Sequence, residues 1–395
     1  MTLLDDVKLL TTANASKVGI LYSIKPDNGN GDINITRSTT ATRVNPSGLI
    51  ETVAINEPQI DYTDGCGCLW VEAISTNINL YSEELDNAAW GKSDVTVTAN
   101  DITSPDGTTN ADKCETLSAP AQMYQAISVA TNTTYTWSFY VKRGTMTDLG
   151  AKVINLDGDP DYVPATSYYS QTSASGWTRV SFTFTTGTNG GNTYFYPINA
   201  SGVTGTVYLW GFQLEQHTIR MSMESSYIPT TSAAVTRNMS VFDKTGLTST
   251  IGSTEGVLFC EMALFWNGTG TPSSRQKMMG WKNVDGRAIL GTWGGSWFCW
   301  LAGAGGNAIF SLTPAITETS FVKMAVKYKA GDQAYWKDGV EIATGTDASA
   351  VSATQDRIVG SYDGISDFWA FYGKIKTIQV YDTALTDAQL LALTS

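Results

Sequence analysis

The chain has 395 residues, of which 42% are hydrophobic and only 16% are charged, and its formal net charge is -12. This length and composition predict two or three globular domains with real hydrophobic cores. The negative charge would repel a phosphate backbone, so no nucleic-acid partner is expected. No stretch approaches the roughly 18 apolar residues of a membrane helix, so no membrane insertion is expected either.

The first 75 residues differ from the rest of the chain. "TLLDDVKLL" predicts a short helix with Leu3, Val7 and Leu10 on one side. The two aspartates stand where a secretory signal would be basic and apolar, so export by that route is not expected. Short strand-like pieces follow, with too few apolar residues for an independent core. Such a segment needs a partner, either the next domain or another copy of the chain.

Residues 76–238 predict a β-sandwich. Several short runs alternate apolar and polar residues and are separated by Gly, Asn, Asp and Ser. Two of these runs place aromatic residues on a single face, namely Tyr135, Trp137, Phe139 and Val141 in "TYTWSFYV", and Tyr208, Trp210, Phe212 and Leu214 in "VYLWGFQL".

Residues 239–395 predict a second sandwich. Asp285-Gly286 and Asp338-Gly339 are two-residue turn signals for hairpins. Thr386 and Gln389 have the spacing of a capping box, which predicts a short closing helix. The predicted fold class is therefore all-β, with two consecutive β-sandwich (jelly-roll) domains preceded by a small N-terminal segment.

The chain contains five cysteines and a single histidine, His217. Cys66 and Cys68 are too close for an easy disulfide, while Cys260 and Cys299 lie in apolar runs and are expected to be small core residues. We interpret all the cysteines as reduced, as in a cytoplasm. One histidine cannot build a histidine-based metal site, and no nucleophile motif lies near it.

"GTWGGSWFCWLAG", residues 291–303, is unusually aromatic. If residues 296–301 form one strand, Trp297, Cys299 and Leu301 face one way, and Phe298 and Trp300 face the other. Both faces cannot be sandwich core. One hypothesis is a platform on which sugar rings stack; the alternative is that most of these rings are buried in the core or in subunit contacts. The residues proposed for the platform are Trp293, Trp297 and Trp300, with Asp285 and Asn307 as partners for sugar hydroxyls.

"NLDGDPDYV" carries alternating oxygen ligands that suit calcium, although their spacing is not that of an EF-hand. A plain solvated acidic loop is the alternative. The candidate calcium ligands are Asn155, Asp157, Asp159 and Asp161, and no other cofactor is expected.

Several stretches resemble a modular arrangement of bacteriophage tail-fibre and other virion fibre proteins. They are "ITRSTTATRVNPSGLIETVAINEPQIDYTDG", "NLYSEELDNAAWGKSDVTVTANDITSPDGTTNADKCETL", and "YLWGFQLEQ" followed by "SSYIPTTSAAVTRNMS". The stretches "AYWKDGVEIATG" and "GKIKTIQVYDTALTDAQLLAL" resemble a laminin-G or concanavalin-A-like sandwich.

The resemblance implies a carbohydrate-binding-like jelly roll over 76–238 and a laminin-G-like domain over 239–395. It also implies a homotrimer in which residues 1–75 attach to other virion proteins and help the chains to associate. The protein would be assembled in the host cytoplasm and exposed on the particle, where host cell-surface polysaccharide would be its partner. Several copies held together would convert weak sugar contacts into avid binding.

These observations favour a non-enzymatic fibre or spike subunit that binds host surface glycans. A purely structural head-fibre, collar or decoration protein is the first alternative. A polysaccharide depolymerase is the second, and it is disfavoured because such enzymes are usually β-helical and the chain lacks the internal repeats of a solenoid. Burial of every tryptophan would favour the structural alternative.

Overall fold

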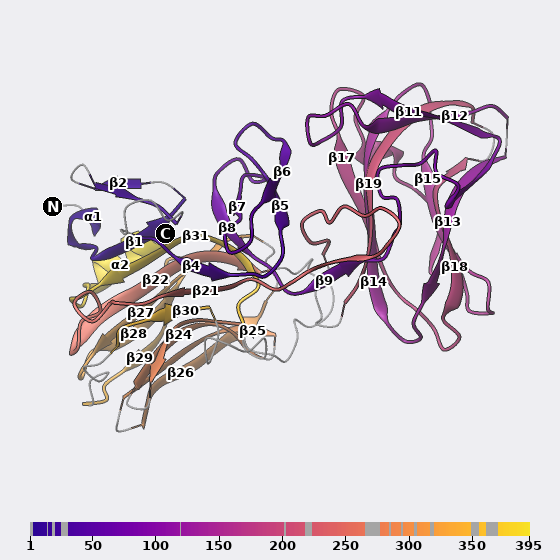
Figure 1. The fold of residues 1–395 in the computed structure, drawn as a ribbon. Coiled ribbons are helices and arrows are strands. Elements are labelled where there is room, and N and C mark those ends of the chain that lie inside the picture. Colours follow the sequence, from indigo (N-terminus) through magenta and orange to yellow (C-terminus); the bar gives the residue numbers. More distant parts are fainter. Residues whose placement is uncertain are drawn as a thin grey trace.

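The computed structural model describes residues 3–13, 15–17, 20–24, 31–118, 120–200, 203–217, 223–264, 277–283, 286–293, 295–303, 306–316, 320–348, 355–360 and 370–395. Within these residues almost all regular structure is β-strand, and two sandwiches stand side by side (Figure 1). This confirms the predicted all-β class. The helical elements described are α1 (Leu3–Asp6), the 3-10 helix η1 (Tyr169–Gln171) and α2 (Asp387–Thr394).

The first sandwich is a jelly-roll-like pair of antiparallel sheets. One sheet has the order β10 (Trp90–Ser93), β13 (Ala121–Val129), β18 (Gly191–Ala200), β15 (Gly150–Asn155) and β16 (Val163–Ser167). The other has the order β11 (Val95–Ile102), β12 (Ala111–Thr116), β19 (Gly205–Gln216), β14 (Thr134–Arg143) and β17 (Thr178–Thr185), joined by β9 (Ser75–Asn77) and β20 (Val235–Arg237).

The predicted alternation holds along β14 and changes within β19. Tyr135, Trp137, Phe139 and Val141 are at most 2% exposed and form the centre of the core. In β19, Phe212 and Leu214 face this core, but Trp210 packs on the opposite side of the sheet. The prediction of one face was wrong because Gly211, at a φ of +66°, lies in a β-bulge that reverses the alternation.

The second sandwich also consists of two sheets. The first has the order β29 (Val340–Gly345), β28 (Gln333–Lys337), β27 (Val322–Lys329), β22 (Glu255–Leu264), β31 (Gly373–Tyr381), β8 (Cys68–Val71) and β7 (Ile60–Asp61), with β1 (Leu9–Thr12) also paired to β31. The second has the order β26 (Gly306–Ala315), β25 (Ser296–Gly303), β24 (Gly286–Trp293), β23 (Lys277–Asn283), β30 (Ile358–Val359), β21 (Val241–Lys244) and β4 (Asn34–Thr36). Two separate hairpins join β2 (Ala15–Lys17) to β3 (Ile20–Tyr22) and β5 (Ala41–Val44) to β6 (Ile50–Val53).

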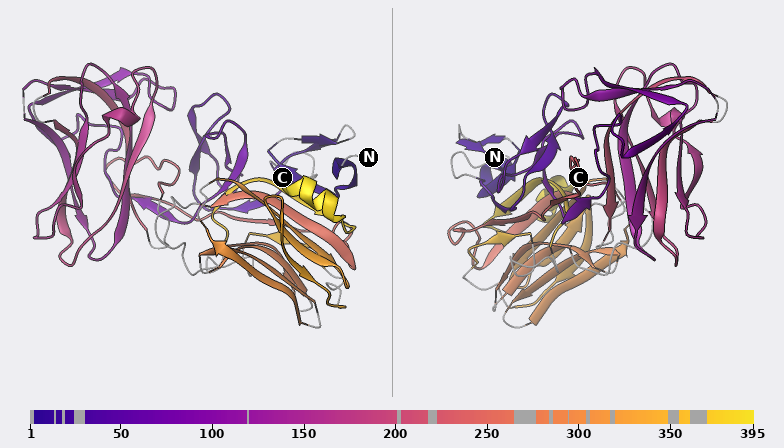
Figure 2. Two further views of the ribbon diagram at one scale, coloured as in Figure 1. Left: turned by 180° about the vertical axis from the view of Figure 1, so that it is seen from behind. Right: turned by 45° about the vertical axis from the view of Figure 1, so that its right-hand side comes forward.

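Two of the local signals in this sandwich are confirmed, while Asp285 of the third lies outside the described residues. Asp338 and Gly339 both have positive φ in the turn between β28 and β29, as a two-residue hairpin requires. The Thr386 hydroxyl accepts a hydrogen bond from the Gln389 amide, and the Gln389 side chain accepts one from the Thr386 amide, so α2 begins at a capping box. Helix α2 then packs against the sheet that contains β27 (Figure 2).

The N-terminal segment does not stand apart before both sandwiches. Strands β1, β4, β7 and β8 all pair inside the second sandwich, and β1 and β8 contribute Leu9 and Leu69 to its core. A segment with too few apolar residues gains its core from a neighbour, here the domain predicted over residues 239–395. The jelly roll is therefore inserted between two parts of the second sandwich, and the chain enters and leaves it through the paired strands β9 and β20.

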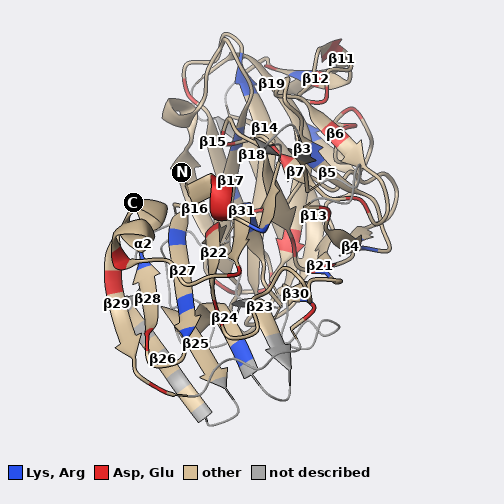
Figure 3. Cartoon of the chain, turned by 90° about the vertical axis from the view of Figure 1, so that its left-hand side faces the viewer, with Lys and Arg blue, Asp and Glu red and all other residues tan. Residues whose placement is uncertain are grey.

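The two chain ends lie near each other on the second sandwich (Figure 1). The predicted N-terminal helix ends early, at Asp6, because the following residues pair with β31. In the view of Figure 3, acidic and basic residues are interspersed over the elements rather than segregated onto one face.

Candidate functional site

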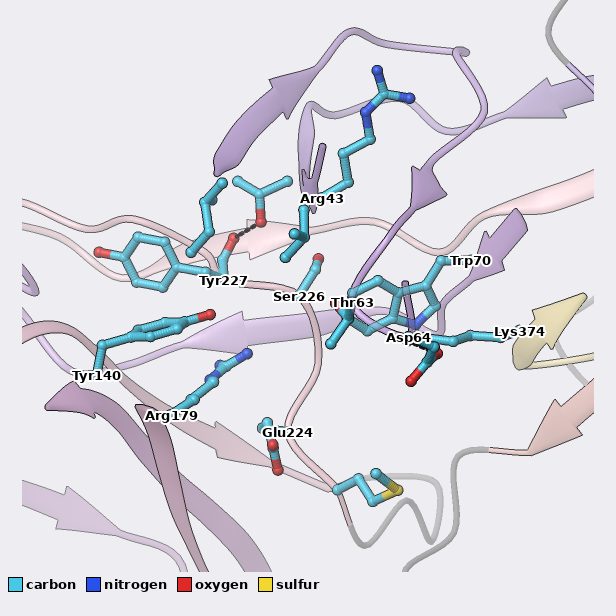
Figure 4. A pocket seen from close by; sticks show the side chains of 14 residues that line it. Arg43, Thr63, Asp64, Trp70, Tyr140, Arg179, Glu224, Ser226, Tyr227 and Lys374 are labelled. Carbon is cyan, nitrogen blue, oxygen red and sulfur yellow. Dashed lines mark hydrogen bonds and ion pairs between the residues drawn. The ribbon is translucent and has the colours of Figure 1, made fainter. Parts of the chain in front are cut away.

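A cavity of about 440 Å³ lies where the jelly roll, the β5–β6 hairpin and the second sandwich meet. We call it the junction cleft. The hairpin contributes β5 and β6, the jelly roll contributes β14 and β17, and the second sandwich contributes β8 and β31 (Figure 4). Its size lies within the range of about 300–1,000 Å³ that is typical of ligand sites.

The β5–β6 hairpin is tied to both sandwiches. The Thr42 hydroxyl donates to the Tyr227 carbonyl oxygen at 2.6 Å, and the Ile50 amide donates to the Pro105 carbonyl oxygen at 2.9 Å, both on the jelly-roll side. On the other side, the Val44 amide donates to the Asp61 carboxylate at 3.1 Å. These bonds fix the hairpin to both walls of the cleft.

Aromatic rings line opposite sides of the cleft. Figure 4 shows Tyr140 on one side and Trp70 on the other. The Tyr140 ring stands edge-on to Trp210 and Tyr227, with centroids at 5.5 and 6.4 Å. Burial raises the pKa of Tyr140, so its phenol keeps its proton at neutral pH and can donate a hydrogen bond. Trp70 is 9% exposed and has the Lys374 ammonium 5.1 Å from its ring centroid.

Lys374 on β31 is held between two carboxylates. Its Nζ lies 2.8 Å from Asp64 and 3.2 Å from Asp61, and Asp61 is fully buried. Burial lowers the pKa of Lys374, but Asp61 and Asp64 raise it by more, and the net direction is upward. The ammonium is therefore charged at neutral pH and already paired.

Arg179 on β17 reaches the cleft from the jelly roll. Its guanidinium donates to the Ser225 carbonyl oxygen at 2.7 Å and to the Ser138 hydroxyl at 3.0 Å, and it lies 5.4 Å from the Tyr140 ring centroid. Burial lowers the pKa of Arg179, but Tyr140 and Glu224 lead the groups that raise it, and the net direction is upward. The Arg179 side chain is thus held by two hydrogen bonds, charged at neutral pH, and close to the Glu224 carboxylate.

A buried polar junction lies beneath the cleft. Glu72 accepts hydrogen bonds from the Ser226 amide and hydroxyl, each at 2.7 Å, and from the Gln59 side chain at 2.7 Å. Its carboxylate also pairs with Arg237 at 3.1 Å, and neither side chain is more than 1% exposed. Arg237 in turn donates to the Ala73 carbonyl oxygen at 2.7 Å. Since Ser226 also lines the cleft, the junction fixes this part of the cleft wall.

The aromatic stretch 291–303 divides between two faces, as predicted for a single strand. Trp297 is 2% exposed and lies in the sandwich core with Cys299 and Leu301. It cannot serve as a surface platform, so its inclusion among the sugar-stacking residues was wrong. Trp293 and Trp300 are partly buried on the outer face, where they pack against Ile289 and Phe298.

The structure brings Trp300 and Asn307 together. The indole N–H of Trp300 donates to the Asn307 side-chain oxygen at 2.8 Å, and the Arg287 guanidinium lies 4.0 Å from the ring centroid. One face of this ring is thus covered by Arg287, which leaves less of it for a sugar. Asp285, the other predicted partner, lies outside the described residues.

The acidic loop at 155–161 does not converge on a calcium site. Asn155 accepts hydrogen bonds from the Asp157 and Asp159 amides at 2.9 Å, and its own side-chain amide donates to the Gly190 carbonyl oxygen. Asp157 accepts from the Asn192 amide at 2.6 Å. Asn155 and Asp157 are thus engaged in hydrogen bonds within the loop and with the neighbouring residues Gly190 and Asn192.

The remaining acids of this loop have their own partners. Asp159 accepts from the Tyr162 hydroxyl at 2.8 Å, and Asp161 pairs with Lys152 at 3.3 Å. Among the residues that the structure describes, no cluster of three or more His, Cys, Asp or Glu is placed to hold a metal ion. The calcium hypothesis is therefore corrected in favour of an acidic loop held by hydrogen bonds and by the ion pair with Lys152.

The structure gives the cysteines and the histidine no catalytic or metal-binding arrangement within the described residues. All five cysteines are free thiols, and Cys260 and Cys299 are fully buried, as predicted. The His217 ring bonds the Thr136 hydroxyl at 2.6 Å at the end of β19, and burial lowers its pKa. None of the helices within the described ranges is long and apolar enough to cross a membrane.

Sequence reasoning missed the junction cleft. Trp70, Tyr140, Arg179 and Lys374 come from four distant segments, and each belongs to a strand whose neighbours are ordinary core residues. No local spacing links them. The one available signal was the aromatic residue on the polar side of "TYTWSFYV", Tyr140, which breaks the alternation of that strand.

No protein-family model and no curated protein matches this chain. Among solved structures, it is similar to domain 4 of an extracellular GH43 arabinanase from Geobacillus stearothermophilus in complex with arabinotriose, at 17% identity over 45% of this chain and 85% of that one, with a TM-score of 0.31. It is also similar to the CBM40 of a Ruminococcus gnavus sialidase bound to α2,3 sialyllactose (18% identity, 36% and 84% coverage, TM-score 0.29). A third is the xylan-binding CBM22-1 domain of Paenibacillus barcinonensis Xyn10C (16% identity, 36% and 92% coverage, TM-score 0.28).

Proposed function

We propose that this protein is a non-enzymatic, glycan-binding subunit of a bacteriophage virion, in a fibre or spike. The observation that carries the glycan-binding part is the junction cleft, where Trp70 and Tyr140 lie on opposite sides of a cavity that Arg179, Glu224 and Asp64 also line. Aromatic rings match the C–H faces of sugars, while charged and hydroxyl groups bond the sugar hydroxyls.

The virion part of the proposal is supported by the resemblance of the sequence to fibre proteins. On this view the attachment surface belongs to those N-terminal residues that do not line the cleft, and three copies of the chain present three clefts to a host polysaccharide. Three weak sites held together bind a repetitive surface polymer far more tightly than one. Sedimentation of the full chain, which measures its mass in solution, tests the trimer.

Binding of the full chain to an array of bacterial surface polysaccharides tests the glycan function. Removing a central ring by Tyr140→Ala should weaken binding about 30-fold, since residues at the centre of an interface contribute about 2 kcal/mol or more. Tyr169→Ala is the matched control, because Tyr169 is a partly buried tyrosine of the same sandwich that does not line the cleft. Absence of binding to every polysaccharide would reject the proposal.

The outer face of the β24–β25 hairpin is the competing sugar site. Trp300→Ala on the same array separates the two sites, because Trp300 lies on that face and not in the cleft. Loss of binding in Trp300→Ala, with Tyr140→Ala unaffected, would move the site to the outer face. A virion protein without receptor binding remains the alternative if both variants and the parent fail to bind.

A further inference from the structure

The cations of the junction cleft are already neutralised. Lys374 pairs with Asp61 and Asp64, at 3.2 and 2.8 Å. Arg43 pairs with Glu51 at 2.6 Å. None of these three pairs needs an external anion to complete it, so neither cation offers an uncompensated charge to a ligand.

Arg179 is the third cation of the cleft, and acidic groups surround it as well. Glu224 lines the same cavity, and the charges of Glu215 and Glu72 also act to raise the pKa of Arg179. Two of its N–H groups are committed to Ser225 and Ser138. Its role toward a ligand is therefore that of a fixed donor beside carboxylates.

The balance of charge in and around the cleft is slightly negative. Among the described residues, the three lining cations Arg43, Arg179 and Lys374 are set against the four carboxylates Asp61, Asp64, Glu51 and Glu224, which line the cleft or pair with those cations. The pair Glu72–Arg237 beneath the cleft adds no net charge. The whole chain carries -12, so its long-range field also opposes an anion.

We infer that the cleft takes an uncharged glycan and disfavours polysaccharides that carry carboxylate, sulfate or phosphate groups. This inference rests on the proposed function. A neutral sugar hydroxyl both donates and accepts, so it can bond a paired carboxylate and a paired guanidinium without separating them. An acidic sugar would have to displace a carboxylate from its cation or lie beside unshielded negative charge, and both cost binding free energy.

A matched pair of ligands tests this inference. A uronic-acid-containing capsular polysaccharide is compared with the same polymer after chemical reduction of its carboxyl groups to alcohols. The reduced polymer should bind the full chain at least about tenfold more tightly, since like charges in an interface are strongly disfavoured. Its affinity should change less than about twofold when NaCl rises from roughly 0.05 to 0.5 M, because no ligand charge is screened.

Three outcomes are distinct. Tighter binding of the unreduced polymer, with an affinity that falls steeply with salt, would overturn the inference and leave the glycan-binding function intact. Failure of every neutral and acidic glycan to bind would overturn the proposed function and the inference with it. Tighter, salt-insensitive binding of the reduced polymer supports both.

A charge variant gives an independent measurement on the same protein. Glu224→Gln removes one negative charge of the cleft at nearly constant shape, so binding of the unreduced polymer should improve several-fold. Glu84→Gln makes the same change in net charge at an exposed residue outside the cleft and should leave that affinity unchanged. Equal effects of the two substitutions would show that only the overall charge matters and would contradict the argument from the cleft.

Discussion

The buried pair Glu72–Arg237 offers the sharpest test of how the two sandwiches are held together. Arg237→Met would leave the Glu72 carboxylate buried without its cation and the Ala73 carbonyl without its donor. Removing one partner of a buried ion pair costs about 3–5 kcal/mol. We expect a loss of this size in the free energy of unfolding, measured by urea denaturation with tryptophan fluorescence as the signal.

Two further variants make the result interpretable. Lys8→Met breaks the pair with Asp382, at 3.5 Å and with side chains 49% and 34% exposed, and should cost about 1 kcal/mol or less. The double variant Glu72→Gln, Arg237→Met removes both charges of this pair and should recover much of the lost stability. If Arg237→Met cost no more than Lys8→Met, or if the double variant were no more stable than the single one, the assigned role of the pair would be wrong.

Three other predictions concern separate parts of the molecule. Trp297→Ala should lower the free energy of unfolding by about 3–5 kcal/mol and Trp300→Ala by less than about 1.5 kcal/mol, because only the Trp297 ring is in the core. Equal losses for the two variants in urea denaturation would contradict the assignment of the two faces. Thr386→Ala should cost about 1 kcal/mol in thermal unfolding and Thr386→Ser much less, since the hydroxyl caps α2; an unchanged melting temperature in Thr386→Ala would exclude this role. Burial raises the pKa of Glu215, but hydrogen bonds from Ser225 and Ser75 lower it by more, so its folded value lies below the ordinary 4.5. Its ionised form therefore stabilises the fold above that pH, and the stability advantage of the parent over Glu215→Gln should shrink as the pH falls below 4.5; an advantage that grew in acid would reverse the argument.

The local patterns of the sequence were sufficient for the fold class and for many individual elements. The inner face of β14, the hairpin turn at Asp338-Gly339 and the cap of α2 each depend on residues only a few positions apart. The opposite faces of Trp297 and Trp300 also followed from strand parity alone. Such features are encoded locally, because side-chain direction in a strand and hydrogen bonding in a cap are set by near neighbours.

The bulge in β19 is a feature that the local sequence pattern did not predict. The sequence predicted one aromatic face for "VYLWGFQL", but the positive φ of Gly211 reverses the alternation and sends Trp210 toward Tyr140 and Tyr227. A glycine within a strand signals that a bulge can form. Whether it does form depends on the register with β14.

Only the tertiary structure decided which strands pair across the chain, and the candidate site follows from that pairing. Strands β1, β4, β7 and β8 could complete a core with the following domain or with another copy, and nothing in their residues chooses between these. Their pairing within the second sandwich makes the jelly roll an insertion and brings Trp70 and Lys374 opposite Tyr140 and Arg179. Pairing partners are selected by the packing of whole sheets. A cleft that forms where several sheets meet therefore cannot be predicted from any one stretch of sequence.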